Sequence, residues 1–176
     1  MKKLLFLIAS LTLVLAACST AKEEAPATST NGAASTEEKA NPAADMMKLY
    51  LSISKSINEV DADLNAFEDA SNEATLPEGP ELQTMKDAAK TAADNATVKV
   101  EGLEVPESLT EHQEAIDSAL SLIKEAYTMK SEALETDGAY VADDANAKFE
   151  EADTKLNAVL EEVGLVGSSI YNEVSL

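Results

Sequence analysis

Four apolar stripes dominate this sequence, and each repeats at alternating spacings of three and four residues. The first stripe consists of Met46, Tyr50, Ile53, Ile57, Val60, Leu64 and Phe67. Side chains at these spacings share one face of an α-helix. The stripe therefore predicts one long amphipathic helix. It should begin at Asn41-Pro42, an N-cap residue followed by a proline at the first helical position, and end before the turn at 76–80.

Three further stripes follow. The second is rich in alanine and contains Leu82, Met85, Ala89, Ala92, Ala96, Val100 and Leu103. The third contains Leu109, His112, Ile116, Ala119, Leu120, Ile123, Tyr127 and Leu134, and the fourth contains Ala142, Ala145, Phe149, Ala152, Leu156, Val159, Leu160 and Val163. The alternation Val98-Lys99-Val100 predicts an irregular end to the second helix. Ser108 and Glu111 fit a capping box at the start of the third.

The stripes predict an all-α fold. Only 4% of the residues are aromatic, and a core of aliphatic side chains and alanine suits helices better than a β-sandwich. Short connections place successive helices antiparallel, so an up-down-up-down four-helix bundle with shallow left-handed packing is expected for residues 41–176. The alternative is a three-helix core to which the alanine-rich second helix is loosely attached.

The charge of the chain restricts its partners. The formal net charge is −20, and removal of Lys2 and Lys3 with a signal peptide would change it to −22. Nucleic acid is therefore not an expected partner. The anionic head groups of a membrane should also repel the folded part, so an anchor is needed to hold it at a membrane.

The N-terminus has the features of an export signal. Lys2 and Lys3 precede the apolar stretch 4–14, which is too short for a permanent membrane span. Leu15-Ala16-Ala17-Cys18 then resembles the lipobox of bacterial lipoproteins, in which the cysteine receives a diacylglyceryl group before cleavage in front of it. The resemblance implies a cleaved signal peptide at 1–17 and a lipid anchor on Cys18. Residues 18–40, which are rich in Ser, Thr, Ala and Glu, are expected to form a disordered linker.

The lipobox also implies a location. It implies that the protein lies on the outer face of a bacterial membrane, which is the cell membrane in a Gram-positive source or the outer membrane in a Gram-negative one. Together with the start of the third helix, Pro106 to His112, it is similar to small all-helical surface lipoproteins of Gram-positive bacteria, most of which have no assigned function. That similarity transfers no functional residue.

His112 is the single histidine, and it lies on or beside the third stripe. A Glu-x-x-His metal motif would need a glutamate at the position of Leu109, and there is no second histidine to complete a site. We therefore interpret His112 as a packed or rim residue and expect no catalytic residue, metal site or cofactor.

Acidic pairs invite a calcium hypothesis. They are Asp61 with Asp63, Asp143-Asp144, Glu150-Glu151 and Glu161-Glu162, and none lies in the glycine-containing loop of an EF-hand. Residues one or two positions apart point to different faces of a helix, so one ion could not reach both carboxylates. The sequence therefore favours solvated acidic faces.

No motif of an enzyme accompanies these features. A glycine-rich phosphate loop and a nucleophile elbow are both missing from the sequence. We expect a non-enzymatic binding or accessory module that is tethered through Cys18, with an envelope protein as a possible partner. The alternative is a carrier of a small ligand or cation within the bundle. A polar-lined pocket that reached His112 would favour the carrier.

Overall fold

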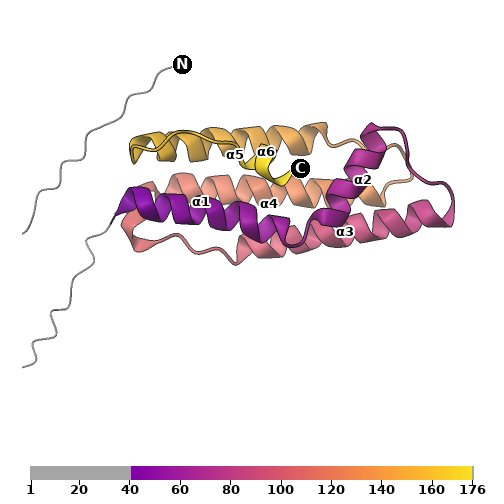
Figure 1. The fold of residues 1–176 in the computed structure, drawn as a ribbon, viewed down its shortest axis with the longest axis horizontal. Coiled ribbons are helices and arrows are strands. Elements are labelled where there is room, and N and C mark those ends of the chain that lie inside the picture. Colours follow the sequence, from indigo (N-terminus) through magenta and orange to yellow (C-terminus); the bar gives the residue numbers. More distant parts are fainter. Residues whose placement is uncertain (1–40, 176) are drawn as a thin grey trace, which may run out of the picture. The chain divides into compact units, whose positions relative to one another are not determined.

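The computed structural model describes residues 41–175, all within one compact unit, Glu38–Leu176. The predictions for the signal peptide, for Cys18 and for the linker 18–40 lie outside these residues. The described part is all-helical and contains no β-strand. Its elements are α1 (Pro42–Asn58), α2 (Ala62–Asn72), α3 (Pro80–Glu101), the 3-10 helix η1 (Glu107–His112), α4 (Gln113–Glu135), α5 (Asp143–Glu162) and α6 (Ile170–Val174) (Figure 1).

The predicted first helix is two helices, which corrects the expectation of a single one. The start is confirmed, because the side chain of Asn41 accepts a hydrogen bond from the backbone N–H of Ala44 at 3.2 Å. The chain then leaves the helix at residues 59–61, and α2 runs at an angle to α1 (Figure 1). The stripe concealed this break, because Ile57, Val60 and Leu64 keep helical spacing across it and no glycine or proline marks it.

Two local predictions for the second and third helices are also wrong. α3 continues as a regular helix through the Val98-Lys99-Val100 segment to Glu101. Ser108 forms no capping box, because its Oγ donates to Asp45 Oδ2 at 2.7 Å and residues 107–112 form η1. Ser108 thereby ties the loop after α3 to the first turn of α1, and a contact between residues so far apart in sequence cannot be read from a local motif.

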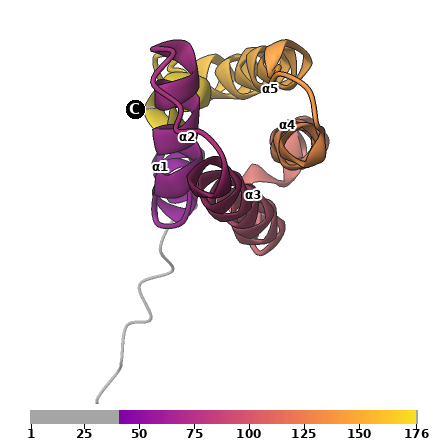
Figure 2. The same ribbon diagram turned by 90° about the vertical axis from the view of Figure 1, so that its right-hand side faces the viewer.

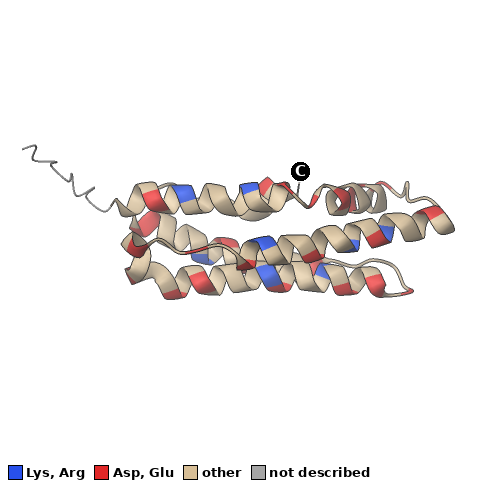
Figure 3. Cartoon of the chain, turned by 90° about the horizontal axis from the view of Figure 1, so that it is seen from below, with Lys and Arg blue, Asp and Glu red and all other residues tan. Residues whose placement is uncertain are grey.

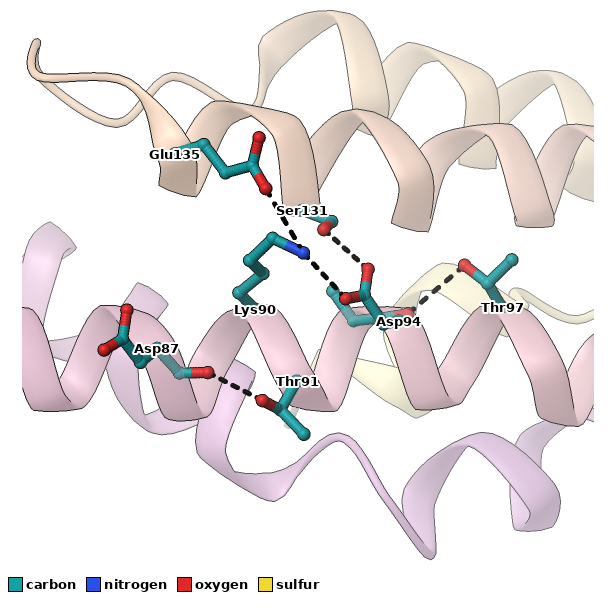
Figure 4. A network of polar contacts seen from close by, with 8 residues as sticks. Asp87, Lys90, Thr91, Asp94, Thr97, Ser131 and Glu135 are labelled. Carbon is teal, nitrogen blue, oxygen red and sulfur yellow. Dashed lines mark hydrogen bonds and ion pairs between the residues drawn. The ribbon is translucent and has the colours of Figure 1, made fainter.

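The alanine-rich α3 is packed along α4, so it is not loosely attached. Ala89, Ala92, Ala93 and Ala96 are buried, and these small side chains let α4 approach closely. Polar contacts also join the two helices: Lys90 Nζ of α3 lies 3.3 Å from Glu135 Oε1 of α4, and Ser131 Oγ of α4 donates to Asp94 Oδ1 of α3 at 2.6 Å (Figure 4). Within α3, Lys90 Nζ also lies 2.8 Å from Asp94 Oδ2.

The C-terminal segment fills the space between α1 and α5, which otherwise meet over only a few residues. Ile170 and Val174 of α6 are buried in the core. Asp153 of α5 accepts hydrogen bonds from Ser169 Oγ at 2.6 Å and from the backbone N–H of Ile170 at 2.7 Å. Side-chain amides of the first two helices bind the other end: Asn58 Nδ2 of α1 donates to the carbonyl of Glu173 at 3.1 Å, and Asn65 Nδ2 of α2 donates to the carbonyl of Val174 at 3.0 Å.

The ends of α2 and α5 have the same backbone geometry with different residues. After α5, Gly164 has φ of 84°, and the N–H groups of Gly164 and Leu165 return to the carbonyls of Glu161 and Leu160 as in a Schellman motif. After α2 the corresponding left-handed position is Ala74, with φ of 55°. A side chain makes this conformation costly, by about 1 to 2 kcal/mol per residue.

We therefore expect Ala74→Gly to stabilise the protein by up to about 1 kcal/mol, because glycine adopts positive φ without the clash at Cβ. Urea unfolding followed by circular dichroism would measure the change. The same substitution at Ala66, an exposed position inside α2, should instead cost about 1 kcal/mol. A loss of stability for both variants would contradict the strain assigned to Ala74.

Candidate functional site

Aromatic side chains gather where α2, α4, α5 and α6 meet. Of the seven Phe and Tyr residues in the chain, five belong to this cluster: Phe67, Tyr127, Tyr140, Phe149 and Tyr171. Tyr127 meets Phe149 edge to face with ring centroids 5.3 Å apart, and Phe67 meets Tyr140 in the same way at 5.2 Å. Phe149 also stacks on Tyr171 at 5.4 Å. Most of the aromatic rings in an otherwise aliphatic core are thus concentrated at one place, and the buried ring of Tyr50 in α1 lies outside it.

A buried ion pair lies within the aromatic cluster. Lys130 Nζ contacts Glu68 Oε2 at 2.9 Å, and the two side chains are only 4% and 16% exposed. Tyr140 Oη donates to the other carboxylate oxygen of Glu68, and Lys130 Nζ lies 5.5 Å from the centroid of Phe149. Burial, followed by the charge of Glu68, raises the pKa of Tyr140, so this hydroxyl stays protonated and remains a donor.

Asp61 is a second buried acid next to the cluster. It is 2% exposed, and Tyr127 Oη donates a long hydrogen bond of 3.5 Å to Asp61 Oδ2. Burial raises the pKa of Asp61 to about 6, although backbone and side-chain hydrogen bonds and the charge of Lys130 oppose the rise. The interpretation of Asp61 as part of a solvated acidic face is therefore wrong.

A polar pocket of about 400 Å³ opens beside this cluster, and α2 forms one of its walls. Asn65, Glu68, Asp69 and Asn72 line it from α2. Glu68 belongs to both the pocket and the buried ion pair. The pocket thus ends on a carboxylate whose position is fixed by Lys130 and Tyr140.

The opposite wall comes from the start of α5 and from the C-terminal segment. Tyr140, Asp143 and Asn146 line one side, and Tyr171 and Ser175 line the other. Asn146 Oδ1 is buried and has no hydrogen-bond partner among residues 41–175. Buried amide oxygens are normally paired, so this oxygen is an unsatisfied acceptor within the pocket wall.

His112 lies far from the pocket. Its Nδ1 is 3.1 Å from Glu162 Oε2, and its side chain is 20% exposed. Glu162 ends α5 while Asn146 is in the first turns of that helix, and sixteen residues of helix separate them by about 24 Å. His112 is therefore a partly exposed residue beside the end of α5, and this pocket does not reach it.

The remaining acidic residues are distributed over the surface. In the view of Figure 3, the positions of Asp and Glu are spread along the helices, with Lys positions among them. In the part of the chain that the structure describes, no group of three or more His, Cys, Asp or Glu side chains has a geometry that could hold a metal ion. The acidic pairs of α5 therefore belong to no such group; they are Asp143 with Asp144, Glu150 with Glu151, and Glu161 with Glu162. None of the helices in that part is both long and apolar enough to cross a membrane.

One feature of the sequence indicates part of this site: a lysine on the apolar face of a predicted helix. Lys130 lies three residues after Tyr127 and four before Leu134, so it occupies the apolar face of its helix. A lysine at such a position needs a buried anionic partner. Nothing local identifies that partner as Glu68, which is 62 residues away.

No protein-family model matches the sequence, and comparisons with curated proteins and with solved structures give no match either. What the pocket binds therefore has to follow from the chemistry of its lining residues.

Proposed function

We propose that this protein is a lipid-anchored, extracytoplasmic binding module without enzymatic activity, and that its ligand site is the pocket between α2, α5 and α6. The observation that carries the proposal is the pocket itself, which combines aromatic walls with a carboxylate that is held in place by Lys130 and Tyr140. Concave sites with a few convergent polar groups are the usual form of small-ligand sites. A nucleophile paired with a base does not accompany these groups among the lining residues.

We also propose that the helices form an antiparallel up-down-up-down four-helix bundle in which α1 and α2 together take the place of the first helix. Support comes from the packing of α4 along both α3 and α5 and from the short connection between α4 and α5 (Figures 1 and 2). Residues 136–142 span at most about 25 Å when fully extended, which is less than the roughly 30 Å length of α5. The chain therefore cannot return along α4 before α5 begins.

Small-ligand binding has more support than docking of an envelope protein. The exposed large apolar side chains of residues 41–175 are Met47, Leu51, Val98, Val141 and Val166, and only Met47 and Leu51 share a helix. Apolar surface of this kind is ordinary for a soluble domain and does not mark an interface. The apolar residues of the first stripe are not available to a partner helix, because they pack in the core of this protein or against it.

The anchor is tested by replacing Cys18 with Ala. Incorporation of radiolabelled fatty acid is expected to disappear, and the unprocessed precursor should accumulate, because the thiol is the attachment point that the lipobox implies. Ser19→Ala is the matched control, since it changes the neighbouring residue and leaves the thiol in place. Undiminished labelling of the Cys18→Ala variant would show that the anchor assignment is wrong.

The pocket is tested with a collection of small cations, anions and neutral compounds, using ligand-observed NMR on the full-length protein in non-ionic detergent. Asn72→Trp adds a large side chain at an exposed position on the pocket wall and should abolish specific binding. Glu114→Trp places the same side chain on exposed α4 and should leave binding unchanged. If no compound distinguishes the two variants, the pocket is not a ligand site.

A further inference from the structure

The charge of the pocket restricts the ligand that it accepts. Three carboxylates, those of Glu68, Asp69 and Asp143, line it, and the lining residues, all within the described part of the chain, include no basic side chain. Lys130, behind the wall, balances one of these charges through its contact with Glu68. Asp69 and Asp143 remain, both on exposed positions at the mouth. The pocket therefore favours a ligand with one or two positive charges.

The pocket walls favour an organic cation over a metal ion. A divalent metal needs several oxygen ligands converging at about 2.0 to 2.6 Å, and the described residues hold no group of three acidic or histidine side chains that could bind one. The pocket volume of about 400 Å³ is also far larger than an ion needs. Tyr140 and Tyr171 line it with aromatic rings, which attract organic cations through their electron-rich faces.

The carboxylates set the type of cation. The carboxylates of Glu68, Asp69 and Asp143 line the pocket, and an ionised carboxylate only accepts hydrogen bonds. A primary or secondary ammonium group can donate to these oxygens, whereas a quaternary ammonium group cannot. We propose that the pocket binds a small aliphatic amine in its protonated form, with an ammonium group at the carboxylates of Asp69 and Asp143 at the mouth. This assignment rests on the proposed function of the pocket as a ligand site.

Calorimetry with 1,4-diaminobutane on the full-length protein in non-ionic detergent tests the assignment. The titration is done at about 0.15 M salt, where the Debye length is about 8 Å and diffuse attraction to a polyanion is largely screened. We expect one saturable site per chain. The bis-quaternary analogue, in which each nitrogen carries three methyl groups, should bind at least tenfold more weakly, because it has both positive charges but no N–H donor. Equal affinities for the two compounds would overturn the assignment.

Two double variants separate the pocket from the overall charge. Asp69→Asn with Asp143→Asn should weaken diamine binding at least tenfold, whereas Glu114→Gln with Asp117→Asn removes the same charge from exposed positions on α4 and should leave the affinity within twofold. Equal losses for both variants would show attraction to the polyanion alone. Calcium chloride should give no stoichiometric isotherm. If calcium instead binds saturably, and this binding is lost in the Asp69→Asn with Asp143→Asn variant, the pocket is a metal site and the amine assignment is wrong.

Failure of the amine assignment can be distinguished from failure of the pocket. A neutral or anionic compound that binds the unmodified protein and is lost in Asn72→Trp would overturn the amine and keep the binding site. If neither the diamine nor any compound of the collection distinguishes Asn72→Trp from Glu114→Trp, both proposals fail. Circular dichroism of each variant shows whether the helical fold is retained, so a binding loss is attributed to the pocket only in folded protein.

Discussion

Glu68→Leu is expected to destabilise the protein by roughly 3 to 5 kcal/mol, because it leaves the ammonium group of Lys130 buried without an anionic partner. The side chain of Lys130 is 4% exposed, so water cannot replace the lost carboxylate. The ring of Phe149, 5.5 Å from Nζ, offsets only a small part of the cost. Lys130→Met should cost less, because Glu68 is more exposed and retains the hydrogen bond from Tyr140.

The double variant Glu68→Leu with Lys130→Met is expected to recover most of the loss. Replacing a buried ion pair by apolar side chains removes the desolvation cost of both charges and is often neutral or stabilising. Urea unfolding of the four proteins gives a double-mutant cycle, whose coupling energy should be several kcal/mol. A simple sum of the two single losses would contradict the buried pair.

An exposed ion pair provides the control for this cycle. Lys124 Nζ lies 3.2 Å from Glu101 Oε1 and links α4 to α3, with side chains 33% and 67% exposed. Pairs of this kind contribute at most about 1 kcal/mol, because water solvates either partner when the other is removed. Glu101→Leu should therefore change stability by less than about 1 kcal/mol.

The periodicity of apolar residues was sufficient to predict the helical class and most of the buried positions. The stripes predicted the helices that the structure shows as α3, α4 and α5, and 17 of their 23 members are buried while the other six are partly buried. The third helix was expected from Pro106, but residues 107–112 form η1 and α4 begins only at Gln113. Apolar spacing reports which face of a helix is covered. It does not report whether the helix is continuous, so the interruption between α1 and α2 was missed: Val60 and Leu64 stay in phase through it.

The candidate site was beyond local patterns for a related reason. Glu68 and Lys130 lie on helices that are distant in sequence, and Asn146 and Tyr171 join them only after α5 and α6 have packed. A carboxylate in a chain with 33 acidic residues has no distinguishing mark until its surroundings are known. Asp61 illustrates the point, because Asp63, two residues away, is exposed. The chemistry of such a site is a property of the packing, which the stripes specify only in outline.

Asp61 should make the stability of the protein depend on pH in the direction opposite to that of an ion-paired carboxylate. Its pKa is raised from 3.8 to about 6 in the folded protein, chiefly by burial. The unfolded chain therefore releases this proton near pH 4, whereas the folded protein holds it to about pH 6. The destabilising contribution is absent below about pH 4, grows between pH 4 and 6, and is complete above pH 6, where two pKa units correspond to about 3 kcal/mol.

Other carboxylates act in the opposite sense at lower pH. Hydrogen bonds from Ser108 and Lys48 hold the pKa of Asp45 below its ordinary value, and Lys99 does the same for Glu59. These groups stabilise the folded protein above the unfolded pKa of an acid, and their contribution is lost as the pH falls through the folded values. Their contacts are exposed and contribute little each. Maximum stability is therefore expected near pH 4.5 to 5, between the two effects.

Asp61→Asn isolates the buried acid, because the amide keeps the shape of the side chain and cannot ionise. At pH 7.5 the variant should be more stable than the original protein by roughly 1 to 3 kcal/mol in urea unfolding, and the difference should shrink toward zero at pH 4.5. Asp63→Asn, at an exposed position of α2, removes the same charge and should change stability by less than about 0.5 kcal/mol at either pH. If Asp61→Asn destabilises the protein at pH 7.5, the contacts of the ionised carboxylate stabilise the folded protein by more than the burial of the charge costs. The same gain at both pH values would mean that Asp61 does not titrate between them.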